Sequence, residues 1–234
     1  MDIFVALALG FAPSLIWLAF FLKEDIHPEP RRMIAKAYIW GGVSAIATLL
    51  IELVANEALR NLVFTLPRLI EDNISVFIGF AVIEEVVKFL FIFLLVRKSP
   101  YFDEPIDAMV YMITGALGFA AAENIFLVFS SGGQDIFGVI LLRFIGATLL
   151  HALSSAIVGH HWARGIKYHI EAKLVIVGLI MASIFHAFFN ILVFKLNDAL
   201  IYPTAFLVLL GFFVLYDFEE LKKMEEKDPT FETT

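Results

Sequence analysis

The sequence contains no cysteine and little charge. Only 18% of its 234 residues are Asp, Glu, Lys or Arg, below the roughly 25% of an average soluble domain. Without cysteine, disulfide bonds and thiolate chemistry are excluded. The formal net charge of −7 gives no reason to expect nucleic-acid binding. The sequence also lacks HExxH, GxSxG and Walker motifs, so the familiar soluble hydrolase and nucleotide-binding signatures are absent.

Hydrophobic residues dominate instead, at 60% of the chain with 25 Phe, against about 45–50% in soluble domains. Long apolar runs predict an all-α, polytopic membrane helix bundle of about seven transmembrane helices. The expected spans are residues 2–22, 36–54, 74–96, 108–130, 136–161, 174–195 and 199–216. We expect a surface helix within 55–73, a single integral membrane domain over 1–216 and a polar cytoplasmic tail over 217–234.

The distribution of Lys and Arg predicts the orientation, because cytoplasmic loops are enriched in these residues. Twelve of the 17 lie on one side, in the loops after the first, third and fifth expected spans and in the tail. Only Arg60, Arg68 and Lys195 lie on the other side. We therefore expect the N-terminus outside and the C-terminus in the cytoplasm.

The span expected at 74–96 carries Glu84, Glu85 and Lys88 near its centre. Each charge costs roughly 2.5–3.5 kcal/mol on the insertion scale, so these side chains should have partners inside the bundle. Glu84 and Lys88 are four residues apart and can form an ion pair that fixes helix packing. Glu85 points about 100° away and would be left without a partner.

Glu123 and Asn124 lie in the next expected span, 108–130, beyond a wall of small residues that includes Gly115 and Gly118. Small residues allow neighbouring backbones to approach closely, so this wall predicts a tight helix interface. The interface explains the glycines and a hydrogen-bonded Asn124, but it gives no reason for a carboxylate in the same wall.

The two following spans carry His151 and His186, and Asn190 comes one helical turn after His186. Four helices thus bring an ionisable group to mid-membrane, and a shared polar cavity is the least costly arrangement for them. We expect Glu52 at the membrane interface and His160 at the membrane edge.

Two kinds of chemistry suit such a cavity. A carboxylate can act as general base towards water while a histidine stabilises an oxyanion. Glu and His are also zinc ligands that leave a position open for water. Both predict hydrolysis, whereas an ion-coupled membrane transporter is the alternative, since pumps also use Glu and His chains. The sequence shows no internal repeat of the kind found in many carriers, which favours hydrolysis.

The ordered motifs resemble the PrsW family of intramembrane proteases, which is distantly similar to the CAAX prenyl protease and Abi families. The motifs are EExxK at 84–88, GFAxxEN at 118–124, the histidine at 151, and HxxxN at 186–190. The loop sequences HPEPRR and FDEPIDAMVY are also similar to the family. The resemblance covers about residues 25–195. It implies an intramembrane endopeptidase in a prokaryotic cell membrane that cleaves a membrane-anchored protein, for example an anti-sigma factor.

By this resemblance, Glu84 is the general base, Glu85 supports it or is a second base, and His186 and Asn190 face the oxyanion. The CAAX group has FxxxH where this sequence has Phe119 and Glu123, so the positioning of water would pass to His151. The site would open towards the extracytoplasmic side.

The resemblance leaves zinc and metal-free glutamate catalysis open. The candidate zinc ligands are Glu85, Glu123, His151 and His186, with Lys88 and Asn124 as structural support. The expected partners are the lipid bilayer and a membrane-anchored protein substrate, without nucleic acid, and the sequence predicts no particular oligomeric state.

Overall fold

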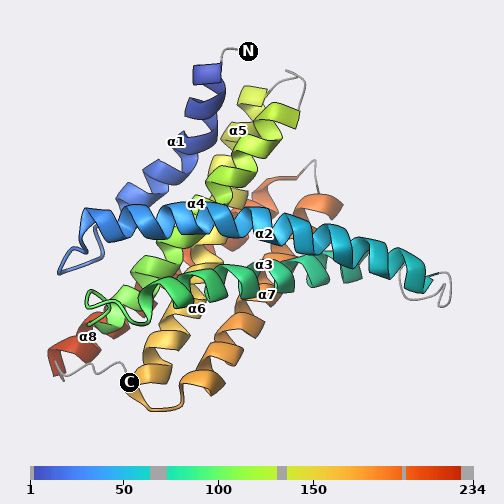
Figure 1. The fold of residues 1–234 in the computed structure, drawn as a ribbon. Helices are drawn as coiled ribbons and strands as arrows, with labels where there is room; N and C mark the ends of the chain where they lie inside the picture. Colours follow the sequence, from blue (N-terminus) through green and yellow to red (C-terminus); the bar gives the residue numbers. More distant parts are fainter. Residues whose placement is uncertain (1–2, 64–72, 131–135, 197–198, 228–234) are drawn as a thin grey trace.

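The computed structural model describes residues 3–63, 73–130, 136–196 and 199–227, and the regular elements in these ranges are all helices (Figure 1). The all-α prediction is confirmed. The helices are α1 (Ile3–Phe21), α2 (Arg31–Val63), α3 (Asn73–Val96), α4 (Pro105–Ser130), α5 (Ile136–Ile145), α6 (Ala147–Lys167), α7 (Glu171–Lys195) and α8 (Ile201–Lys227).

Five segments are long and apolar enough to cross a membrane: Arg31–Ala55, Pro105–Ser130, Ile136–Lys167, Glu171–Lys195 and Ile201–Met224. The two remaining expected spans correspond to α1, whose apolar run is shorter, and to α3, whose 24 residues include the three central charges. The helices therefore follow the seven expected spans in order.

Two expected segments differ in their helix limits. Helix α2 runs unbroken for 33 residues through positions 56–63, where we expected a separate surface helix; residues 64–72 lie outside the described part of the chain. The span expected at 136–161 is divided at Gly146 into α5 and α6. The apolar residues around Gly146 are continuous in the sequence, so they did not indicate the break there. The polar residues after position 55 did not mark a helix end, because a helix can continue with one face exposed to solvent.

Helix α8 continues past residue 217, where we expected a solvated tail to begin. Phe218 and Leu221 are fully buried in it, and Lys222 donates a hydrogen bond to Glu24 in the loop after α1, at 2.8 Å. His160, expected at the membrane edge, is buried on α6 with its ring nitrogens 3.4 and 3.3 Å from carboxylate oxygens of α8. Residues 228–234 lie outside the described part.

Helix α4 is the centre of the bundle, since an almost continuous stretch from Pro105 to Ala121 is buried. Its first residue is a proline, whose missing N–H is not needed in a first turn. Helices α1, α2 and α6 pack against α4, and α7 and α8 pack against α6. In Figure 1, α2 and α3 lie side by side and cross the other helices.

The small-residue wall of α4 forms a close helix contact, as predicted. A Cβ atom added at Gly41 of α2 would lie 1.8 Å from the carbonyl oxygen of Gly115, and one added at Gly118 would lie 1.9 Å from that of Tyr38. Both clashes involve backbone atoms, so a larger residue would have to move a whole helix.

We predict that Gly41→Ala and Gly118→Ala each destabilise the protein by at least about 1–3 kcal/mol, the usual cost of overpacking. Thermal unfolding in detergent measures the effect. Gly79→Ala and Gly211→Ala are the matched controls, because a Cβ there meets nothing within 4 Å, and they should leave stability unchanged or slightly higher. Equal midpoints in all four variants would contradict a close α2–α4 contact.

Candidate active site

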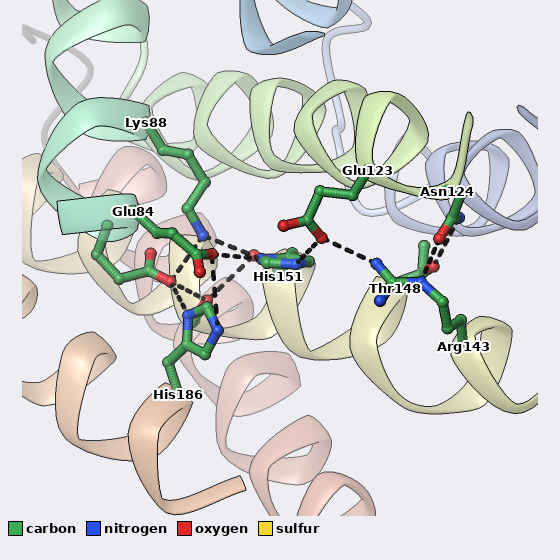
Figure 2. A network of polar contacts seen from close by, with 10 residues as sticks. Glu84, Lys88, Glu123, Asn124, Arg143, Thr148, His151 and His186 are labelled. Atoms are coloured by element: carbon green, nitrogen blue, oxygen red, sulfur yellow. Dashed lines mark hydrogen bonds and ion pairs between the residues drawn. The ribbon is translucent and has the colours of Figure 1, made fainter. Parts of the chain in front are cut away.

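Charged and polar side chains from α3, α4, α6 and α7 meet in one connected network (Figure 2). The shared polar site expected from the sequence is therefore present. Glu85, Lys88, Asn124, His151 and His186 are almost completely buried, whereas Glu123 is half-buried. These side chains can meet because each of them lies on the face of its helix that points into the bundle.

One oxygen of Glu85 holds three helices together. Its Oε1 accepts hydrogen bonds from Lys88 Nζ of α3 at 2.6 Å, Ser154 Oγ of α6 at 2.9 Å and His186 Nδ1 of α7 at 2.7 Å. A carboxylate can only accept, so His186 carries its proton on Nδ1. The other ring nitrogen of His186, Nε2, is then left facing Glu84, 3.7 Å from its Oε2.

His151 is held in the same manner by a different carboxylate. Its Nε2 donates to Glu123 Oε2 at 2.9 Å, and its Nδ1 accepts from Lys88 Nζ at 3.2 Å. That Nδ1 also lies 3.7 Å from Glu84 Oε2. The two histidine rings are in edge-to-face contact, with centroids 5.1 Å apart.

Glu84 stands between the two histidines and is the odd member of the group. Its Oε2 is buried and has no hydrogen-bond partner among the described residues. The possible ion pair between Glu84 and Lys88 is not formed, and Glu85, expected to lack a partner, bonds Lys88 instead. Both spacings, three and four residues, bring side chains together on a helix, and here Ser154 and His186 supply the remaining partners of Glu85.

Arg143 of α5 closes the network on the side of Glu123. It donates to Glu123 Oε2 at 2.8 Å and to the side-chain oxygen of Asn124, whose Nδ2 in turn donates to Thr148 at 3.3 Å. The supporting role expected for Asn124 agrees with these contacts. Asn190 is half-buried on α7, one turn after His186.

A family comparison decides what kind of protein carries this site. The sequence profile described as PrsW family intramembrane metalloprotease matches residues 29–216, most of the chain. The chain belongs to the PrsW family. It is an intramembrane protease, as the resemblance implied.

Curated relatives agree with the PrsW assignment. Protease PrsW of Bacillus subtilis is 26% identical over 91% of this chain and 93% of its own length. Protease PrsW of Oceanobacillus iheyensis is 26% identical over 94% of this chain and 96% of its own length. No solved structure matches. The comparisons give no support to the transporter alternative.

Because the PrsW family is described as metalloproteases, the residues can be tested against a metal. Ligand atoms of Glu84, His151 and His186 lie within 4.8 Å of one another. In a tetrahedral zinc site with bonds of about 2.1 Å, ligand atoms are about 3.4 Å apart, close to the 3.7 Å from Glu84 Oε2 to each histidine nitrogen. Glu85 and Glu123 bind the far nitrogens of the two histidines, as carboxylates commonly do behind metal-ligating histidines. The types and spacing of these donors therefore fit zinc, and Lys88 Nζ, which bonds the same nitrogen of His151, would have to give up that contact.

Charge balance points the same way in this PrsW-family site. Among the described residues, the three carboxylates Glu84, Glu85 and Glu123 face two permanent cations, Lys88 and Arg143, and His151 is a neutral ring because it accepts from Lys88. An excess of buried negative charge requires a cation or a proton.

Sequence reasoning missed Glu52, which we expected at the membrane interface. Its Oε1 is buried without a hydrogen-bond partner among the described residues. Glu52 lies within α2, which continues to Val63, and its side chain is half-buried. Only the helix boundary could have revealed this.

We predict that Lys88→Met lowers the free energy of unfolding by about 3–5 kcal/mol, because it leaves the buried Glu85 carboxylate without its cation. Adding Glu85→Gln should restore part of the loss, since the pair is then neutral. Thermal unfolding of wild type, both single variants and the double variant measures the coupling. Strictly additive losses would show that the two side chains do not interact.

Proposed function

We propose that this PrsW-family chain is an endopeptidase that hydrolyses a peptide bond of a membrane-anchored protein at Glu84, His151 and His186. The observation that carries the proposal is the Oε2 atom of Glu84, which has no hydrogen-bond partner among the described residues and lies 3.7 Å from a nitrogen of each of the two histidines. The other nitrogen of each histidine is bonded to a carboxylate, Glu123 or Glu85. An anti-sigma factor, the example implied by the family resemblance, is a substrate of this class.

Zinc is the cofactor we propose, with Glu84, His151 and His186 as its ligands. When bound, zinc polarises the carbonyl of the peptide bond and makes water a better nucleophile. This set differs from the one expected from the sequence, which included Glu85 and Glu123. Those two carboxylates instead accept the ring N–H groups of the histidines, which fixes each ring with its other nitrogen towards Glu84.

Glu123 is the group we propose to take a proton from the attacking water and pass it to the leaving amine. Its side chain is 30% exposed, whereas that of Glu85 is fully buried, so water reaches Glu123. Arg143 and His151 both bond Oε2 of Glu123, and Figure 2 shows the other oxygen without a dashed contact. Arg143, which bonds Glu123, is the donor we propose for the developing oxyanion. Asn190, one turn after His186, is the further donor that the family resemblance implies.

A metal-free mechanism is the second candidate, and one observation favours it. Lys88 Nζ lies 3.2 Å from His151 Nδ1, one of the nitrogens that a zinc ion would need. In that mechanism Glu84 itself, supported by Glu85, takes the proton from water, as the family resemblance implies.

We predict that Glu84→Gln and His186→Ala lose bound zinc together with cleavage, whereas Glu123→Gln keeps zinc and cleaves about 10²–10⁴-fold more slowly, the usual effect of removing a general base. The measurements are zinc content of the purified protein and cleavage of a panel of single-span proteins in reconstituted membranes, with and without a chelator. His169→Ala, in the loop before α7, is the control and should keep both.

Each mechanism has its own outcome. Cleavage that resists the chelator but is lost in Glu84→Gln would reject zinc and support the metal-free mechanism. Full cleavage in Glu84→Gln, Glu85→Gln and Glu123→Gln together would reject this site.

The orientation remains a proposal, with the N-terminus outside and the C-terminus in the cytoplasm, on the basis of the Lys and Arg distribution. The contacts support its internal consistency, since Lys222 of α8 bonds Glu24 after α1, and His27 bonds Glu104 before α4. In this orientation Glu123 lies seven residues from the outer end of α4, about 10 Å at about 1.5 Å per residue.

We therefore predict that the substrate is cut near the extracytoplasmic end of its span. Mass spectrometry of the products locates the cut, and reporter fusions at the C-terminus of the protease fix its orientation. A cut on the cytoplasmic side, with a cytoplasmic C-terminus, would contradict a site open to the outside.

A further inference from the structure

The loop between α1 and α2 meets the loop between α3 and α4. His27 Nδ1 lies 2.9 Å from Glu104 Oε1, and the hydroxyl of Tyr111 donates to the carboxylate of Glu29. The sequences HPEPRR and FDEPIDAMVY begin in these loops, and the proposed catalytic site does not use them. Their meeting is a feature of the fold that needs its own explanation.

Three carboxylates gather where the loops meet. Oxygen atoms of Glu29, Asp103 and Asp107 lie within 4.8 Å of one another, and Asp25 lies nearby. Within the described ranges, no lysine or arginine forms an ion pair with these three. Like charges this close repel unless a cation or a proton lies between them.

Asp107 is the buried floor of this cluster. Its side chain is 0% exposed, and its Oδ2 accepts the backbone N–H groups of Asp103 at 3.0 Å and Glu104 at 2.8 Å. Its other oxygen, Oδ1, is buried, and no N–H or O–H group of the described residues donates to it; the carboxyl of Glu29 can bond Asp107 only when a proton lies between the two. A buried carboxylate oxygen without a partner is costly, so the arrangement favours a ligand there.

The rim of the cluster is open. Asp103 is exposed and Glu29 is half-buried, so an ion can enter from solvent.

We infer that Glu29, Asp103 and Asp107 form a binding site for a hard divalent cation, Mg²⁺ or Ca²⁺. Oxygen ligands without nitrogen or sulfur are the set that these ions prefer. The ion links the two loops and fixes the first turn of α4. Asp107 precedes Glu123 by 16 residues on α4, about 24 Å at about 1.5 Å per residue, so the site is separate from the catalytic one.

Thermal unfolding of the full-length protein in detergent tests the inference, after removal of bound metal and with ionic strength held constant. Mg²⁺ and Ca²⁺ are titrated separately. At about 100 times the half-saturating concentration, the preferred ion should raise the unfolding midpoint by roughly 5–10 °C. Trp162 provides a fluorescence signal, since its ring stacks on Phe102 beside Asp103, with centroids 4.8 Å apart.

Asp103→Asn is the main variant, because Asp103 is exposed and the change keeps its shape. It should raise the half-saturating concentration at least about tenfold, since it removes one of three charged ligands. Glu29→Gln is a second variant, and Glu219→Gln, an exposed carboxylate on α8, is the matched control that should behave as wild type.

Two outcomes overturn the inference. The midpoint of wild type does not respond to either ion, as expected if Glu29 and Asp107 only share a proton. Alternatively, wild type and Asp103→Asn respond equally, which places the ion elsewhere, including at the catalytic site. Neither outcome depends on cleavage, so the proposed proteolytic site stands or falls separately.

Discussion

The burial of the Glu85 carboxylate is the constraint on which the rest of the site depends. A charge at mid-membrane is tolerated only with partners, and removing one partner of a buried pair costs about 3–5 kcal/mol. Glu85 Oε1 accepts from Lys88, Ser154 and His186, so α3, α6 and α7 cannot separate without exposing it. The same contact fixes the tautomer of His186. The same oxygen atom therefore contributes to the packing of these three helices and to the orientation of a histidine of the site.

Helices α2 and α4 are held together by close backbone contact, whereas hydrogen bonds to Glu85 hold α3, α6 and α7 together. Lipid tails are as apolar as the side chains, so helices associate in a membrane through tight packing. Gly41 and Gly118 bring the two backbones together, and Glu52 and Glu123 lie further along the same two helices. The contact thus holds α2, which carries the half-buried Glu52, against the helix that carries Glu123.

The sequence contains the fold class and the set of helices that build the site, because apolar run length and mid-span charges can both be read residue by residue. The partners of each charge cannot be read in that way. Lys88 is within reach of Glu84 and Glu85 alike, and Ser154 and His186, from other helices, decide in favour of Glu85. The place of Glu52 depended on a helix end that an amphipathic pattern did not mark.

Hydrolysis within a membrane also requires a route for water, and exposure varies across the site in one direction. Glu85 is fully buried, the side chain of Glu84 is 12% exposed, and those of Glu123 and Arg143 are 30% and 24% exposed. The polar path therefore opens at the α4–α5 side, where the short helix α5 carries Arg143. Water and a peptide carbonyl that enter there meet Glu123 and Arg143 before Glu84. The more exposed pair therefore suits the proton transfer and carbonyl binding that we propose. The two buried histidines suit the binding of the proposed metal ion.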